Sequence, residues 1–361
     1  MAPRTTVASH MVDLTTLRNV EWTRDGVRLI DQRQLPNRLT FLLCRNYRQV
    51  ARAIRDMTVR GAPAIGVTAA MGLALAAKRS RHSDGKMLLL DVEKAAEIIR
   101  ATRPTARNLF WAVERMLGKA REAADQGRDM RETLATEAQL MADEDVQANR
   151  KMGAYGAELI QDGDTILTHC NTGTMATVSY GTALGVIRSA ISQGKKVKLI
   201  ATETRPRQQG ARITVYEALS DKIPVTLIVD SAVAITMSKG MVDKVIVGAD
   251  RITRTAVANK VGTFMIALAA KHHCIPFYVA APTTTFDLTI EPTAMSIEER
   301  DPREVTEING RQITPKKGVR VFNPAFDLTP LELVTAVITE KGVLSREQIQ
   351  NMTKIRANTG G

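Results

Sequence analysis

The chain of 361 residues has few of the residues and motifs that mark several large classes of protein. Its three cysteines, Cys44, Cys170 and Cys274, are an odd number without CxxC spacing, which disfavours a disulfide framework and fits a cytoplasmic compartment. No long uncharged apolar stretch occurs, so we predict no membrane span. HExxH, GxxxxGK[ST] and GxGxxG are also missing, which argues against zinc, nucleoside-triphosphate and dinucleotide sites.

Positive charge is abundant, but the features that accompany it in nucleic-acid-binding proteins are not. The net charge is +12, and aromatic residues make up only 4% of the chain, which leaves few side chains for base stacking. Lysine and arginine are spread along the chain and form no basic tail. We therefore expect a basic surface that attracts phosphorylated metabolites, and no nucleic acid as the main partner.

Hydrophobic periodicity predicts an α/β protein with a mostly helical N-terminal domain and a small sheet, followed by a Rossmann-like parallel sheet flanked by helices. Strands are expected at 27–30, 39–43, 165–168, 197–202, 225–229, 244–247, 277–280 and 319–322. Helices are expected at 47–55, 65–77, 90–101, 106–124, 130–159, 176–191, 210–219, 232–237, 259–271 and 330–339. We expect domains at 21–150 and 151–361, after a flexible leader over 1–20 or an expression remnant ending at Met11.

Polar or reactive residues follow the strands of the predicted parallel sheet. They are Cys170, Thr204-Arg205, Asp230-Ser231, Asp250-Arg251 and Pro282-Thr283. Because the carboxyl ends of parallel strands meet at one edge of a sheet, these residues together predict a ligand site. Each alone could be a helix cap, and Asp230 in particular fits that simpler role.

Cys170 and Asp250 are the candidates for proton transfer at this edge. The segment 171–174 is expected to open a helix, which would place Cys170 beside free backbone N–H groups. A thiol and a carboxyl group whose pKa is raised by burial can both exchange protons near neutral pH. The simpler alternatives are a buried structural cysteine and an Asp250 that caps a helix or pairs with Arg251. His169 is adjacent in the strand, points to the opposite face and forms no nucleophile–base pair.

Three basic segments predict a phosphate site. Arg60 and two small residues precede a helix, where backbone N–H groups and a guanidinium group favour an anion, although a plain helix start is the alternative. Arg103 precedes another helix. Lys260 is expected in the first turn of a helix, where a cation is disfavoured unless an anion is near.

Ten ordered segments between residues of about 20 and 340 resemble those of the methylthioribose-1-phosphate isomerases. The superfamily of these enzymes also contains regulatory subunits of the translation-initiation guanine-nucleotide-exchange factor. The segments include MTVRGAPAIG, THCNTG, ETRPRQQGARIT, VGADRI and NKVGT. The resemblance implies an aldose–ketose isomerase of methionine salvage that converts 5-methylthioribose 1-phosphate to 5-methylthioribulose 1-phosphate.

The resemblance also implies a homodimer without a metal or an organic cofactor. It places the catalytic pair on Cys170 and Asp250 and the substrate contacts on Arg60, Gly61, Ala62, Arg103, Gln209, Asn259 and Lys260. Gln209 is implied by the resemblance alone. The chain departs from many members before its Asn-Lys pair, where it lacks Asn-Gly-Asp and carries Thr255 at a position often held by Asp, which bears on the sugar contacts of this loop.

Three alternatives stay open at this point. Isomerases of ribose 1,5-bisphosphate and of 5-deoxyribose 1-phosphate share the implied chemistry, although the first would need a second phosphate site. A regulatory subunit of a translation factor would have no need for Cys170 and Asp250, and this chain contains both.

Overall fold

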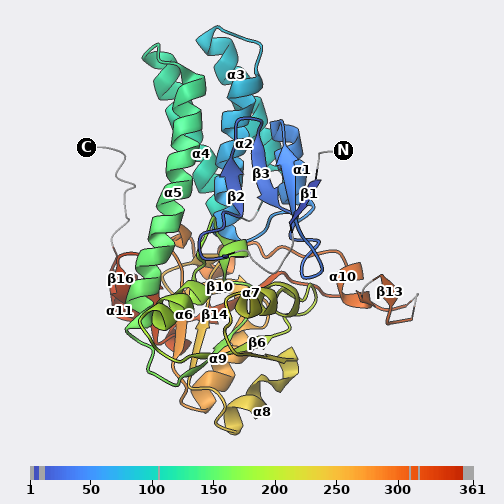
Figure 1. Cartoon of the computed structure of the whole chain (residues 1–361), viewed down its shortest axis with the longest axis vertical. Coiled ribbons are helices and arrows are strands. Elements are labelled where there is room, and N and C mark those ends of the chain that lie inside the picture. Colours follow the sequence, from blue (N-terminus) through green and yellow to red (C-terminus); the bar gives the residue numbers. More distant parts are fainter. Residues whose placement is uncertain (1–3, 8–12, 105, 309, 316–317, 353–361) are drawn as a thin grey trace.

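The structure is a computed structural model that describes residues 4–7, 13–104, 106–308, 310–315 and 318–352. The first part of the chain packs helices against a small antiparallel sheet (Figure 1). This sheet has the order β1-β4-β3-β2, with β1 (Arg4–Val7), β2 (Val20–Trp22), β3 (Val27–Ile30) and β4 (Leu39–Cys44). The helices are α1 (Tyr47–Arg55), α2 (Ala62–Arg79), α3 (Gly85–Arg100), α4 (Arg107–Asp125) and α5 (Met130–Ala157).

Helix α2 forms the centre of the helical part. It is built largely from alanine and other small apolar residues, which are buried on nearly every face, and α1, α3, α4 and α5 all pack against it. Gly66 lets the backbone of Asn108 approach, since a Cβ there would lie 2.9 Å from the Asn108 carbonyl oxygen. This close packing fixes the first turn of α2, which faces the second part of the chain.

The second part contains a mostly parallel sheet with the order β16-β15-β11-β8-β5-β6-β7, in which only β16 is antiparallel to its neighbour. Its strands are β5 (Thr165–Thr168), β6 (Lys198–Thr202), β7 (Val225–Ile228), β8 (Lys244–Val247), β11 (Phe277–Ala280), β15 (Ala336–Thr339) and β16 (Gly342–Leu344). The helices are α6 (Ala183–Ser192), α7 (Val215–Ser220), α8 (Val233–Ser238), α9 (Thr263–His272), α10 (Arg303–Thr306) and α11 (Arg346–Asn351). β14 (Phe326–Pro330), β10 (Ala256–Lys260) and β9 (Arg251–Ile252) form a smaller sheet, and β12 (Glu307–Ile308) pairs with β13 (Arg311–Gln312).

Both faces of the large sheet are covered, which confirms the predicted α/β class. Val245 and Val247 of β8 belong to one hydrophobic cluster, whereas Ile246 belongs to another on the opposite face. The strands predicted at 165–168, 244–247 and 277–280 and the helix at 47–55 have the predicted bounds. None of the described helices is long and apolar enough to cross a membrane.

Two predicted helices begin later than expected. Helix α6 starts at Ala183 and not at 176, because Glu217 accepts the backbone N–H groups of Thr174 and Met175 and holds this segment in an irregular course. Asn259 and Lys260 do not open a helix but end strand β10, where they pair with β14. The chain turns into α9 only after Gly262, whose φ of 105° suits glycine.

The predictions near the C-terminal end are wrong. Residues 319–322 form no strand, and Phe322 is 79% exposed. Residues 330–339 form a short 3-10 helix and then strand β15, because the β-branched run Val337–Thr339 is paired with β11 and β16. Tertiary pairing here prevails over an apolar spacing that is typical of a helix.

The predicted leader lies partly outside the described residues, which exclude 1–3 and 8–12 and therefore Met11. Arg4–Val7 pair with β4. Leu14 and Asn19 are buried, and the Asn19 amide donates to the carbonyl groups of Met175 and Thr177 at 3.1 Å. Helix α5 crosses the domain boundary predicted at residue 150 and packs against α6, so it links both parts (Figure 1).

Candidate functional site

A cavity lies between the carboxyl ends of the parallel strands and the first turn of α2. Nine residues singled out from the sequence all line it: Arg60, Gly61, Ala62, Arg103, Cys170, Gln209, Asp250, Asn259 and Lys260. These residues lie between positions 60 and 260 of the sequence, from the turn before α2 to the end of β10. The fold therefore brings the predicted proton-transfer pair and the predicted phosphate contacts into one place.

Cys170 follows β5 in a left-handed backbone conformation, with a φ of 66°. Its N–H group donates to Thr204 Oγ1 at 2.9 Å, and its carbonyl group accepts from Thr214 Oγ1 at 2.7 Å. Asp230 in turn accepts the backbone N–H groups of Thr204 and Arg205 at 2.8 and 2.7 Å. The carboxylate of Asp230 thus fixes the loop after β6, which fixes Cys170.

Beside Cys170 the expected helix is only a single 3-10 turn, Thr174–Ala176, and α6 begins at Ala183. The neighbouring His169 is buried, with Nδ1 2.6 Å from Thr202 Oγ1 and Nε2 2.9 Å from the Val261 carbonyl oxygen. Burial lowers the pKa of His169 and favours the neutral ring. Both ring nitrogens are engaged away from the thiol, so His169 holds β5, β6 and the turn after β10 together.

Asp250 follows β8 after Gly248 and Ala249, and its N–H group donates to the Ala258 carbonyl at 2.9 Å. Burial raises the pKa of the Asp250 carboxyl, while the charges of Arg103, Arg60 and Lys260 act in the opposite direction. The net effect is a carboxyl group that keeps its proton to higher pH than an exposed aspartate.

Arg60 reaches the cavity from the turn before α2. Its Nη2 donates to the Asn171 carbonyl oxygen at 3.1 Å, whereas its buried Nη1 has no hydrogen-bond partner. Gly61 adopts a φ of 99°, and a Cβ there would lie 2.3 Å from the Ala176 carbonyl oxygen. Only glycine therefore lets the start of α2 pack against the loop that follows Cys170.

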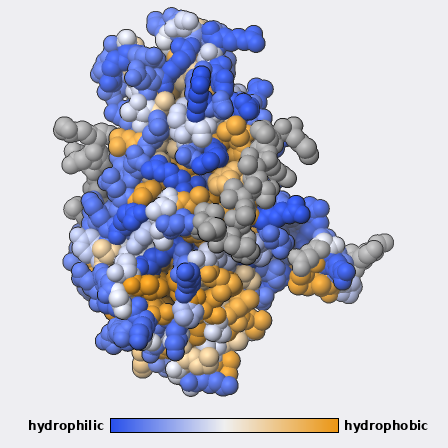
Figure 2. Space-filling model, viewed as in Figure 1, coloured by the Kyte–Doolittle hydropathy of each residue, from blue (hydrophilic) through white to orange (hydrophobic). Residues whose placement is uncertain are grey.

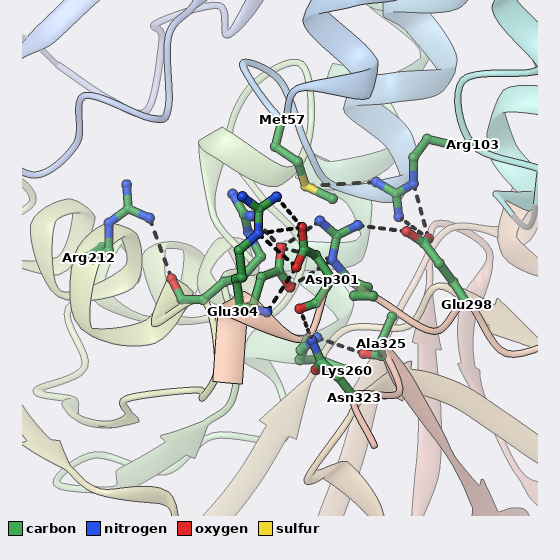
Figure 3. Close-up of polar contacts among 12 residues, drawn as sticks. Met57, Arg103, Arg212, Lys260, Glu298, Asp301, Glu304, Asn323 and Ala325 are labelled. Carbon is green, nitrogen blue, oxygen red and sulfur yellow. Dashed lines mark hydrogen bonds and ion pairs between the residues drawn. The ribbon is translucent and has the colours of Figure 1, made fainter. Parts of the chain in front are cut away.

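A network of arginine–glutamate ion pairs lies along one side of the cavity (Figure 3). Arg103 donates through Nε and Nη2 to Glu298 Oε2 at 3.2 and 2.9 Å, and its Nη1 lies 3.9 Å from the Met57 sulfur. Glu298 also accepts from Arg300 at 2.6 Å. Glu304 accepts from both Arg300 and Arg207 at 2.7 Å. The two glutamates hold three guanidinium groups around the site and offset much of their charge.

Lys260 points into the same region and donates to the Ala325 carbonyl at 2.7 Å (Figure 3). Burial lowers the pKa of Lys260, and the nearby Cys170 and Asp250 oppose that shift. Gln209 lines the cavity just before a π-helical turn (Gly210–Thr214), and its buried Oε1 has no partner. In the described part of the chain, no group of three or more His, Cys, Asp or Glu side chains is placed to hold a metal ion.

Sequence reasoning missed Arg207, Arg300 and their glutamate partners. Arg207 lies within the segment ETRPRQQGARIT, so its place beside Gln209 was a usable signal. Arg300 belongs to a charged stretch, EERDPRE, that looks like a solvated loop in sequence. Arg300 pairs locally with Glu298 and with Glu304 of α10. The stretch is joined to the cavity by the ion pair between Glu298 and Arg103, 195 positions away, which no local pattern indicates.

Comparison with known proteins agrees with this geometry. Residues 58–346 match the model of the Initiation factor 2 subunit family. A methylthioribose-1-phosphate isomerase of Thermosipho africanus is 51% identical over 338 residues, which are 93% of this chain and 97% of that protein. One from Desulforamulus reducens is 48% identical over 340 residues, or 93% and 98% of the two chains.

Two solved structures are similar along nearly the whole chain. The 5-methylthioribose 1-phosphate isomerase of Pyrococcus horikoshii has a TM-score of 0.86 and 43% identity, and covers 94% of this chain and 95% of its own. A structure from A. fulgidus described as translation initiation factor eIF-2B, subunit delta, has a TM-score of 0.81 and 52% identity over 91% and 96% of the two chains. The chain belongs to the Initiation factor 2 subunit family, among its methylthioribose-1-phosphate isomerases.

Proposed function

We propose that this protein isomerises 5-methylthioribose 1-phosphate to 5-methylthioribulose 1-phosphate in methionine salvage. The names of relatives about half identical over nearly their full length support this reaction. The observation that carries it is the single cavity that holds Cys170, Asp250 and the cations Arg60, Arg103 and Lys260. The cations suit a phosphate, and the pair suits proton transfer on the attached sugar.

The chemistry requires an acid because the substrate is a glycosyl phosphate whose ring does not open by itself. Asp250, whose pKa is raised by burial, protonates the ring oxygen as the bond from C1 to that oxygen breaks. The hydrogen on C2 then moves to C1, and the 2-hydroxyl group returns a proton to the Asp250 carboxylate, which leaves a ketone at C2 and restores the acid. The atoms of substrate and product therefore balance without a co-reactant.

Two routes are open for the hydrogen that moves from C2 to C1. Cys170 carries it if it leaves as a proton, and the buried residues around the half-buried Cys170 limit the access of water if it moves as a hydride. Deuterium from the solvent enters C1 of the product only by the first route, so its incorporation separates the two.

The direct test is turnover of the wild-type protein, followed by phosphorus NMR. We expect conversion of 5-methylthioribose 1-phosphate to the ketose and much weaker turnover of ribose 1,5-bisphosphate, because the Glu298 and Glu304 carboxylates that pair with Arg300 and Arg207 disfavour a second phosphate beside them. A well-folded protein that turns over only the bisphosphate would contradict the proposal, whereas turnover of 5-deoxyribose 1-phosphate would extend it to a second substrate.

The A. fulgidus structure motivates a second candidate, a regulatory subunit of a translation factor. A subunit of that kind needs neither a buried acid nor unpartnered donors in a cavity, and this chain has both. A stable complex with an initiation factor, together with no isomerase turnover, would favour the second candidate.

We propose further that two copies of the chain pair through the apolar surface around β7, the edge strand of the large sheet. Large apolar side chains are exposed there: Leu219, Leu227, Val229, Ile235 and Met241. Figure 2 shows apolar residues gathered around α7 on the lower part of this face. An exposed apolar edge strand is a ready template for association. We also propose a cytoplasmic location, which fits the three free cysteines.

A further inference from the structure

Thr172 has a buried hydroxyl group that the fold leaves without a partner. The side chain is 4% exposed, its Oγ1 makes no hydrogen bond, and the residue lines the cavity. A buried hydroxyl group is unfavourable unless it is hydrogen-bonded. The hydroxyl of Thr172 is therefore available to a ligand that enters the cavity.

The position of Thr172 is well fixed by its surroundings. Its carbonyl oxygen accepts the N–H groups of Thr182 and Leu184 at 2.8 and 3.3 Å. Its methyl group lies against Gly248, since a Cβ on that glycine would be 3.2 Å from Thr172 Cγ2. Thr172 is thus two residues from Cys170 and in contact with the residue two positions before Asp250.

Two other residues that line the cavity also have a buried polar atom without a hydrogen-bond partner. Arg60 Nη1 and Gln209 Oε1 are also buried without a partner, and both residues were implied as substrate contacts by the resemblance. Thr172 was not among those contacts, although its environment is the same. The shared pattern is a polar atom that is positioned by the fold and completed only by a ligand.

We infer that the Thr172 hydroxyl hydrogen-bonds a sugar hydroxyl oxygen of the substrate, close to the carbons between Cys170 and Asp250. The inference rests on the proposed function and adds a binding residue to it. The cations Arg60, Arg103 and Lys260 match a phosphate, whereas a neutral hydroxyl matches a neutral sugar oxygen.

The test replaces the hydroxyl group with a methyl group of the same size, in Thr172→Val. We expect kcat/KM for 5-methylthioribose 1-phosphate to fall about tenfold, the loss expected for one hydrogen bond. The melting temperature should stay the same or rise, because the free protein loses an unpartnered polar group. Inhibition by inorganic phosphate should not change, and Thr172→Ser should keep most of the activity.

Thr168→Val is the matched control. Thr168 lies in β5, is 1% exposed and also has an unpartnered Oγ1, but it is not among the described residues that line the cavity. Its replacement should leave kcat/KM unchanged. Full activity of Thr172→Val, an equal loss in Thr168→Val, or an equal weakening of phosphate inhibition would overturn the inference. An inactive wild type would contradict the proposed function itself, and the inference with it.

Discussion

Asp250 is poorly solvated and surrounded by cations, and burial is the larger of the two effects on its pKa. A carboxyl group with a raised pKa binds its proton more tightly in the folded chain than in the unfolded chain. Stability is then greatest at low pH and falls as the pH rises from the ordinary aspartate range to the raised pKa. The carboxyl group that we propose for ring opening therefore lowers the stability of the fold at neutral pH.

Asp250→Asn should raise the melting temperature relative to wild type, and by more at about pH 8 than at about pH 4, near the ordinary aspartate pKa. Thermal unfolding at both values measures this. Asp301→Asn is the control: Arg303 lowers the pKa of Asp301 to about 2, so this exposed carboxylate stays charged across the window. If Asp250→Asn raises the melting temperature equally at both pH values, the pKa of the Asp250 carboxyl is not raised in the folded chain.

Cys170 and Asp250 could be found from sequence because each lies within three residues of the end of an apolar strand, and strand ends share one edge of a sheet. Gln209 could not, since its place depends on a π-helical turn that has no clear sequence signature. The sequence does not point to Thr172, because a threonine shortly after a strand is typical of a turn. The Thr172 hydroxyl group lacks a hydrogen-bond partner, and only the three-dimensional packing reveals this.

The start of α2 belongs to the helical part of the chain and packs against the loop that follows Cys170. Sequence reasoning located this helix and its Gly-Ala-Pro start because alanine content and proline position are local signals. The errors at 176–191 and 259–271 have another origin. There the helical spacing was real, but Glu217 and strand β14 provide partners from distant parts of the chain.

Gly61→Ala should destabilise the protein by about 1–3 kcal/mol, because its φ of 99° and its contact with Ala176 leave no room for a Cβ. It should also weaken substrate binding, since Arg60 is adjacent. Gly118→Ala, in an exposed and open position of α4, should instead stabilise by about 0.5–1 kcal/mol. Denaturant titrations measure both, and equal effects would refute the argument from close approach.

The chain has a basic cavity and, apart from it, an apolar surface around β7. The cavity suits a phosphorylated substrate, and the apolar surface suits the pairing of two copies that we propose. Net positive charge fits attraction of a phosphorylated substrate, as the sequence indicated. The apolar surface was not visible in the sequence, because its members come from α7, β7, α8 and the turns that follow β7 and α8, and they are interleaved with less exposed residues.

Analytical ultracentrifugation should give a wild-type mass of twice the 39.5 kDa of one chain. Leu227→Lys places a charge on the exposed edge of β7 and should shift the protein toward monomers, because lysine blocks edge pairing. Leu140→Lys, at a similarly exposed position on α5, should leave the mass unchanged. A monomeric wild type would contradict the proposed pairing.

The most direct test of the proposed chemistry is the rate of ketose formation from 5-methylthioribose 1-phosphate by wild type, Cys170→Ser and Asp250→Asn. We predict an active wild type and a loss of about a hundredfold or more in each variant, with folding intact by circular dichroism. Near wild-type rates in either variant would contradict the assignment of the catalytic pair.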